Sequence, residues 1–142
     1  MYKLFTKEQA TALLPVVDEK LRELQGAVRD IAALRSELQS LPPTSLRAQA
    51  AAEELKFVMA AAYATKQELD RMGVFVQDLE RGLVDFPSRL GAEVVYLCWE
   101  QGEDAITHFH RLNQGVGARR PLPLHAPNQH APTNGTEPRA SA

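Results

Sequence analysis

Acidic residues and histidines crowd into residues 78–110 of this chain. Carboxylate and imidazole groups together ligate many divalent metal ions, so a metal site is the sharpest chemical hypothesis for this stretch. The candidate groups are Asp78, Glu80, Asp85, Glu100, Glu103, Asp104, His108 and His110. The chain contains no H-E-x-x-H motif, so spacing alone does not specify an ion, and solvated acids or structural hydrogen bonds are the favoured interpretation.

Helical geometry would limit such a site. The acids at the start of residues 102–112 favour a short helix there, because they suit the positive end of a helix dipole. His108 and His110 would then lie about 200° apart around the helix and could not share one ion. A metal site would therefore need Asp85 or Glu100 from a neighbouring strand.

Asp85 needs a partner if it points inward, because it lies between apolar residues in LVDFP. The available partners are Arg81, Arg89, Arg119 or a backbone turn, and we expect a structural Asp–Arg pair rather than a ligand site. Arg119 follows the glycines of NQGVGARRPL, which suggest an anion site. That segment follows a predicted helix instead of opening one after a strand, so we favour a turn that docks onto the sheet.

Two long helices are predicted before this region. Thr6 and Gln9 have the spacing of a capping box, and prolines in residues 41–45 end the first helix and allow the second to start. The apolar stripe of the first helix is Ala10, Leu14, Val17, Leu21, Leu24, Val28, Ile31, Leu38 and Leu41. Pro15 either kinks this helix or marks a break. The second helix should end at Gly73, and the short connection makes the pair an antiparallel, coiled-coil-like hairpin.

After the hairpin the apolar period changes to two, which is typical of strands. VFVQDL, LVDFPSR and VVYLCWE, with turns between them, predict a small antiparallel three-stranded sheet. Val95, Leu97 and Trp99 should share one face of the last strand. Cys98, on the other face, is expected to be a small buried apolar residue rather than a nucleophile.

The predicted fold class is therefore α+β: a long helical hairpin, a three-stranded β cap and a short C-terminal helix. Residues 1–124 form one domain in this prediction. Residues 125–142 are rich in Pro, Gly, Ala, Asn and Thr, which predicts a disordered tail whose histidines are bystanders.

Composition narrows the classes of function. Sixteen basic and eighteen acidic residues among 142 give a net charge of −2, so binding to nucleic acid is not expected. A single cysteine excludes an intramolecular disulfide framework, and no apolar run reaches the roughly 20 residues that a membrane span needs. The N-terminus has no signal-peptide core, so we expect a cytoplasmic protein.

Several segments carry a family resemblance: FTKEQATALLPVV, GVFVQDLERGLVDFP, VYLCWEQGE and FHRLNQGVGARRPL. Together they resemble domain-of-unknown-function family 2203, an uncharacterised prokaryotic family, over roughly residues 4–122. Phe109 stands where that family usually has Trp, and Val116 where it usually has Phe; both substitutions keep an apolar residue. The resemblance implies the architecture and a prokaryotic cytoplasmic setting, and it supplies no catalytic residues.

Two hypotheses about function remain. The first is a non-enzymatic scaffold or interaction module that forms a homodimer through the helical hairpin and binds an unidentified protein. The alternative is a metal-dependent or anion-binding enzyme with a site under the β cap around Asp85, Glu103 and His110, with Arg119 as a further binding residue. No cofactor is predicted, although a divalent metal fits the second hypothesis.

Overall fold

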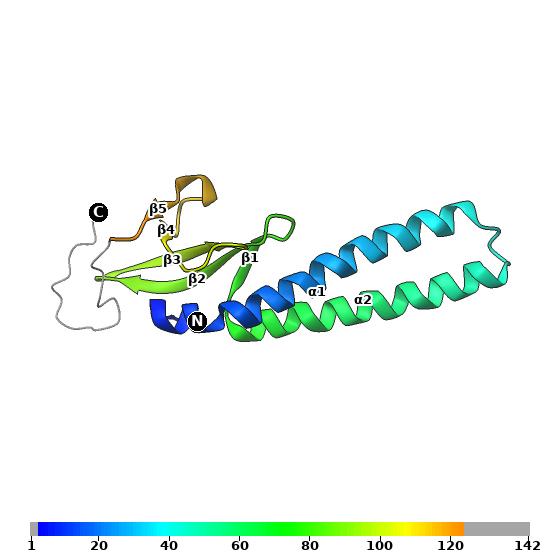
Figure 1. Ribbon diagram of the computed structural model, residues 1–142, viewed down its shortest axis with the longest axis horizontal. Helices are drawn as coiled ribbons and strands as arrows, with labels where there is room; N and C mark the ends of the chain where they lie inside the picture. Colours follow the sequence, from blue (N-terminus) through cyan, green and yellow to red (C-terminus); the bar gives the residue numbers. More distant parts are fainter. Residues whose placement is uncertain (1–2, 124–142) are drawn as a thin grey trace. The chain divides into compact units, whose positions relative to one another are not determined.

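The computed structural model describes residues 3–123, which form two compact units (Figure 1). Residues 17–71 form one unit, a helical hairpin, and the remaining described residues form a second unit built on a β-sheet. The tail predicted over residues 125–142 lies outside the described residues. In the described part of the chain, no helix is both long and apolar enough to cross a membrane.

Helix α1 spans Lys7–Ser40 and starts where the capping box predicted. The Thr6 hydroxyl accepts a hydrogen bond from the Gln9 backbone N–H at 3.0 Å, and the Gln9 side chain accepts one from the Thr6 N–H at 2.9 Å. Two of the N–H groups that lack an intrahelical partner are thereby satisfied. Pro15 lies within α1, on an exposed position, so it does not divide the helix in two.

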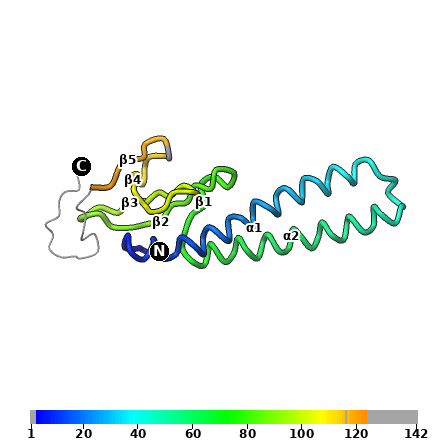
Figure 2. The backbone as a smooth tube through the Cα atoms, in the orientation of Figure 1, coloured from blue at the N-terminus to red at the C-terminus, as the bar shows by residue number. Residues whose placement is uncertain are grey.

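Helix α2 spans Leu46–Met72 and ends at Gly73, whose φ of 86° is the left-handed conformation that favours glycine after a helix. Figure 2 traces the chain out along α1 and back along α2 through residues 41–45. The polar pairs that join the two helices are Lys20–Glu68, Glu23–Thr65 and Glu37–Arg47. From one pair to the next, the residue number on α1 rises while the residue number on α2 falls, as an antiparallel hairpin requires.

One member of the predicted apolar stripe is misplaced. Val28 is 52% exposed, whereas Leu34, which is not a member of the predicted stripe, is buried. The buried side of α1 advances from Leu24 to Ala27 and Ile31, both half-buried, before it reaches Leu34. The steps from Leu21 to Leu24 and from Leu24 to Ala27 are both three residues, which shifts the seam around the helix and departs from the regular heptad.

The sheet is antiparallel and has five strands in the order β1-β2-β3-β4-β5. The strands are β1 (Phe75–Asp78), β2 (Leu83–Leu90), β3 (Glu93–Glu100), β4 (His108–Arg111) and β5 (Arg120–Pro121), with a 3-10 turn at Val116–Ala118 before the last. The three predicted strands are thus confirmed, but the predicted three-stranded sheet lacked β4 and β5.

The predicted C-terminal helix over residues 102–112 is wrong, because its second half is strand β4. Residues 101–107 form turns and bends, and Gly102 adopts a φ of 105°. Ile106, Thr107 and Phe109 are β-branched or aromatic and suit a strand. Pairing of β4 with β3 satisfies the backbone of this segment through long-range contacts, which outweigh the local helix signal of the acids.

One face of the sheet carries the apolar core of its unit. Val95, Leu97 and Trp99 are buried together on it, as predicted. Phe5 packs edge-on against Phe86 at 5.4 Å, and the Phe5 N–H donates to the Pro87 carbonyl. Pro87 is tolerated within β2 because β1 pairs only as far as Asp85, and Phe5, which bridges β2 at Ser88, uses the Pro87 carbonyl and needs no N–H from the proline.

Candidate functional site

The hairpin of β2 and β3 places Asp85 directly opposite Cys98. A turn at Gly91 and Ala92 joins the strands, and Leu90 pairs with Glu93 at its base. Starting from that pair, the register of the hairpin determines which residues of β2 and β3 lie opposite one another. Asp85 and Cys98 consequently share the face of the sheet that Phe5 does not cover.

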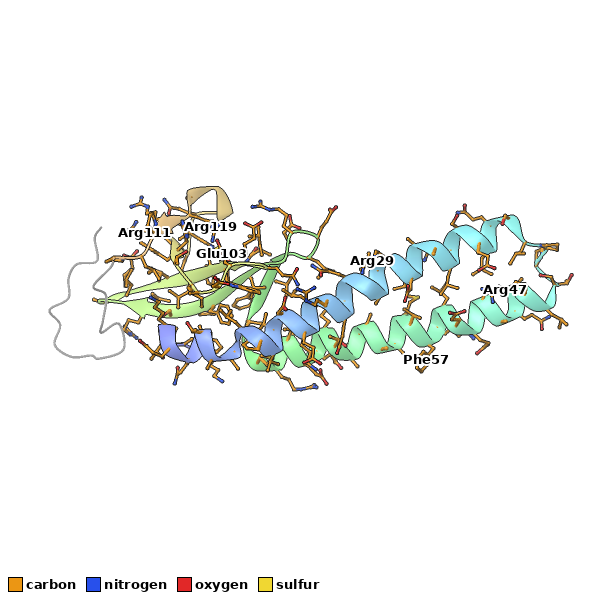
Figure 3. All side chains as sticks on the ribbon, in the orientation of Figure 1. Arg29, Arg47, Phe57, Glu103, Arg111 and Arg119 are labelled. Carbon is orange, nitrogen blue, oxygen red and sulfur yellow. The ribbon has the colours of Figure 1, made fainter. Side chains whose placement is uncertain are left out.

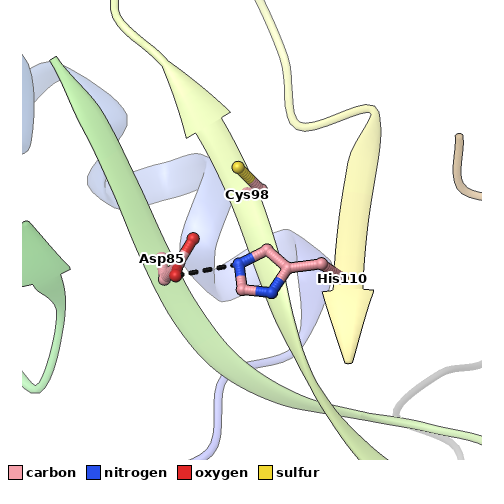
Figure 4. A group of neighbouring side chains, drawn as sticks. All are labelled: Asp85, Cys98 and His110. Atoms are coloured by element: carbon pink, nitrogen blue, oxygen red, sulfur yellow. Dashed lines mark hydrogen bonds and ion pairs between the residues drawn. The ribbon is translucent and has the colours of Figure 1, made fainter. Parts of the chain in front are cut away.

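His110 reaches the same cluster from β4. Its Nε2 lies 2.9 Å from the Asp85 Oδ2, and Figure 4 shows the imidazole extending across β3 to meet the carboxylate. Asp85 and Cys98 are fully buried and His110 is 3% exposed. One donor atom from each of the three side chains lies within 4.8 Å of the other two. Three strands thus bring a carboxylate, a thiol and an imidazole together away from solvent.

The hydrogen bonds of His110 fix which ring nitrogen carries a proton. Nδ1 lies 3.1 Å from the Arg111 carbonyl oxygen, which can only accept, so Nδ1 must be the donor. In a neutral imidazole, Nε2 is then an acceptor, yet it faces the Asp85 oxygen. A further proton must lie between these two atoms, either on the carboxyl group or on a doubly protonated ring. The pair as a whole is electrically neutral in both cases.

Burial changes the acid–base behaviour of the two other groups. Desolvation raises the pKa of Asp85, against the opposing influence of His110, Cys98 and Gln77. Burial together with the nearby Asp85 charge raises the pKa of the Cys98 thiol to about 11, although Arg119 opposes this shift. The second carboxylate oxygen, Oδ1, is buried and has no hydrogen-bond partner of good geometry. In this state Cys98 is a neutral thiol.

A second polar group lies beside the first, on the far side of Cys98. Arg119 donates to both carboxylate oxygens of Glu103 at 3.2 Å and to the Cys98 carbonyl at 3.4 Å. Figure 3 shows the labelled Glu103 and Arg119 side by side in the sheet unit. Glu103 also closes its own turn, because its side chain accepts the Glu100 N–H and its carbonyl accepts the Trp99 indole N–H. Glu103 therefore anchors the segment between β3 and β4.

The predicted Asp85–arginine pair is wrong, since the partner of Asp85 is His110. Arg119 pairs with Glu103, Arg81 with Glu100, and Arg89 is exposed. A neutral Asp–His pair holds the carboxyl group in the sheet without burying a full guanidinium charge beside it. The expectation that the Arg119 segment docks onto the sheet agrees with its contact to the Cys98 carbonyl.

The other acids and the second histidine lie apart from this cluster. Asp78 accepts the Arg81 N–H in the turn after β1, and Glu80 and Asp104 are exposed. His108 is on the same face as His110 because both belong to a strand, which reverses the geometry expected for a helix. Its Nδ1 contacts the Thr107 hydroxyl at 2.8 Å instead of the buried group.

The arrangement excludes one chemistry and permits another. Cys98 is buried and its pKa is high, so it lacks the exposed thiolate that a nucleophilic cysteine needs. Tyr96 adds to the cover, since its ring centre lies 5.3 Å from that of His110 and 5.9 Å from that of Phe75. Thiol, imidazole and carboxylate are, however, all ligands of borderline metal ions.

Comparison with known proteins identifies the family. Residues 3–122 match the family model DUF2203, whose description is "Uncharacterized conserved protein". The chain belongs to the DUF2203 family. No curated protein and no solved structure matches it. The DUF2203 match spans both compact units, including every member of the buried cluster, and brings no assigned activity with it.

Proposed function

We propose that this DUF2203 protein is a non-enzymatic interaction module that forms a homodimer through helix α2. The observation that carries the proposal is a second apolar stripe on α2, opposite the side that faces α1. The side toward α1 is lined by Ala48, Ala51, Leu55, Val58, Ala62 and Leu69, all buried or half-buried. The opposite side carries Leu46, Ala50, Glu53, Phe57, Ala60 and Ala64, all exposed.

The spacing of the exposed stripe suits another helix. Its members follow one another at alternating steps of four and three, the heptad spacing of a helix that packs lengthwise against a partner. Leu46 is 83% exposed and Phe57 74% exposed, and Figure 3 shows Phe57 pointing away from α1. Ala60 and Ala64 after Phe57, and Ala50 before Glu53, leave room for close approach of a second backbone.

A second copy of the chain is the occupant that this surface fits best. From Leu46 to Ala64 the stripe runs about 27 Å along α2, at 1.5 Å per residue. A two-fold axis near residue 55, the midpoint of the stripe, would set Leu46 against Ala64 and Ala50 against Ala60 of the other copy, which makes the two ends of the stripe self-complementary. Glu53 is the one charged residue in the stripe, and its ion pair with Lys56 lies at the edge.

The alternative is a metal-dependent or anion-binding enzyme around Asp85, Glu103 and His110. Two of its parts, anion binding and enzymatic activity, are weakened, and one part, cation binding, is supported. The anion-binding part is weakened because Arg119 already faces Glu103 at 3.2 Å and Glu100 at 3.8 Å. An added anion would have to displace both carboxylates. The enzymatic part is weakened by the burial of Asp85 and His110, which leaves a substrate no direct access. Cation binding keeps specific support, because Asp85 and His110 lie together with Cys98.

Mass measurement in solution tests the dimer directly. We expect light scattering coupled to size-exclusion chromatography to report twice the chain mass for the wild type, and the mass of a single chain for Phe57→Glu. Burying a glutamate at the centre of an apolar interface leaves an unpaired charge there. Val28→Glu is the matched control, since Val28 is an exposed apolar residue of α1 outside the stripe, and this variant should stay dimeric.

Three outcomes would contradict the proposal in different ways. A monomeric wild type at tens of micromolar would remove the dimer altogether. A dimeric Phe57→Glu variant would place the interface elsewhere. Dissociation of the Val28→Glu variant with retention of the Phe57→Glu dimer would assign the interface to α1.

A further inference from the structure

We propose that Asp85, Cys98 and His110 bind one divalent ion of the zinc class, through a carboxylate oxygen, the thiolate sulfur and the imidazole Nε2. This inference is independent of the dimer, because all three residues belong to the sheet unit. Their donor atoms come from β2, β3 and β4 and lie within 4.8 Å of one another. Figure 4 shows the three side chains beside one another on neighbouring strands, with the contact between Asp85 and His110 dashed.

The donor spacing is close to what a tetrahedral ion requires. Zinc binds sulfur at about 2.3 Å and nitrogen or oxygen at about 2.0 to 2.1 Å, which places donors about 3.3 to 3.8 Å apart around the ion. The 2.9 Å contact between Asp85 and His110 therefore has to open by less than about 1 Å, and the contacts to sulfur, which are no longer than 4.8 Å, have to shorten by at most a similar amount. Side-chain rotation can supply shifts of this size.

The orientation of His110 is that of a metal ligand. Histidines that bind metals usually donate their second ring N–H to a carbonyl or carboxylate, which fixes the tautomer. His110 does so through Nδ1 to the Arg111 carbonyl at 3.1 Å. The lone pair of Nε2 is consequently left for the group that contains the carboxylate and the thiol.

An electropositive partner is required at this position even without a metal. With Nδ1 protonated, Nε2 and the Asp85 Oδ2 each direct a lone pair at the other, so a proton or another cation has to lie between them. A proton satisfies these two atoms but leaves the buried Oδ1 without a partner. A metal ion would satisfy the nitrogen, the carboxylate and the sulfur together, which accounts for the unpaired oxygen as well.

The buried site can exchange two protons for a divalent ion without a change in its net charge. Without metal, the thiol and the Asp85–His110 pair are together neutral. Binding of a divalent ion would release the thiol proton and the shared proton, which leaves a thiolate, a carboxylate and a neutral imidazole around two positive charges. The site is neutral before and after, so no net charge is buried. Arg119 does not add an uncompensated positive charge, because Glu103 pairs with it.

The ligand set selects a class of metal. A thiolate is a soft ligand that favours zinc and similar late transition-metal ions, whereas magnesium and calcium prefer oxygen ligands alone. Three protein ligands leave a fourth position for the second carboxylate oxygen or a water molecule.

Cobalt(II) provides a direct test, since it enters zinc sites and gives a sulfur-to-metal charge-transfer band in the near ultraviolet when a thiolate binds it. Cys98 is the only cysteine in the chain, so any such band must come from this residue. The experiment uses the untagged full chain, reduced and freed of metal with a chelator. It titrates cobalt(II), then displaces it with zinc(II), with magnesium(II) as a comparison.

We expect one cobalt per chain, the charge-transfer band, release of about two protons per ion, and displacement by zinc but not by magnesium. Cys98→Ser should abolish the band, and Asp85→Asn and His110→Asn should each weaken cobalt affinity by at least about 100-fold, the upper end of what loss of a supporting residue costs. His108→Asn is the matched control on the same strand face, and it should bind as the wild type does. Circular dichroism of each variant establishes that it is folded.

Each contrary result overturns the proposal. Absence of the band from the folded wild type would leave the cluster as a structural hydrogen-bonded group. Stoichiometric cobalt without the band would place the ion at other residues. Unchanged affinity in both folded Asp85→Asn and His110→Asn, or a loss in His108→Asn equal to theirs, would show that the ligand set is not the one named here.

Discussion

Raising the pH should destabilise the metal-free protein through Cys98, because burial raises the pKa of its thiol from 9.0 to about 11. In the unfolded chain the thiol ionises near the lower value, so between the two values the native state keeps a proton that the unfolded state has released. The stabilisation is therefore complete below the lower pKa and is lost as the pH rises through the higher one. The difference between the two pKa values corresponds to about 2 to 3 kcal/mol.

The assay compares urea denaturation of the wild type and Cys98→Ser across this pH range, in the presence of chelator and reductant. Trp99 is the only tryptophan and is buried on β3, so its fluorescence reports unfolding of the sheet unit. Titration of tyrosines and lysines affects both proteins equally and cancels in the difference. The wild type should lose roughly 2 to 3 kcal/mol more than the serine variant. Parallel losses in the two proteins would refute the argument that burial keeps the thiol protonated.

Two further substitutions test the geometry of the sheet unit, each by urea denaturation followed at the same tryptophan. Asp85→Ala should lower the free energy of unfolding by about 3 kcal/mol, because it leaves the buried His110 nitrogen without a partner. Asp85→Asn should lower it by about 1 kcal/mol or less, because the Asn amide can still donate to that nitrogen. Equal losses in the two variants would contradict the neutral pair. Gly82→Ala should cost about 2 to 3 kcal/mol, since the glycine has a φ of 73° and a Cβ there would lie 2.5 Å from the Gln101 side chain. Gly91→Ala is its control, with a φ of 65° but no atom within 4 Å, and should cost only about 1 kcal/mol.

Local signals were sufficient for much of the fold. The capping box marked the start of α1, the prolines at residues 41–45 its end, and Gly73 the end of α2, because each of these residues acts on its immediate neighbours. Alternation of apolar residues likewise located β1, β2 and β3. Strand β4 was missed because its stability comes from pairing with β3, while the acids before it suggested a helix.

The buried cluster was recovered only in part. Asp85 was singled out because an acid between apolar residues needs a partner, but arginine was expected as that partner instead of His110. The alternative hypothesis did place Asp85 and His110 together under the sheet, but it named Glu103 as the third member, whereas the structure has Cys98 there. The helix assigned to residues 102–112 also separated His108 from His110. Because the segment is a strand, both histidines lie on the face that carries Asp85.

The role of Cys98 could have been found from the sequence, because the short turn at Gly91 and Ala92 sets the register of β2 and β3. Counting back from the pair Leu90–Glu93 brings Asp85 opposite Cys98 without any knowledge of the rest of the fold. A thiol opposite a buried acid is no longer simply a small apolar residue, because the acid's charge makes ionisation of the thiol harder and its free oxygen offers a ligand beside the sulfur. The same pairing accounts for two opposite properties of Cys98. Without metal, burial and the neighbouring carboxylate keep the thiol protonated and inert, and with metal the carboxylate would become the second anionic ligand that balances the ion.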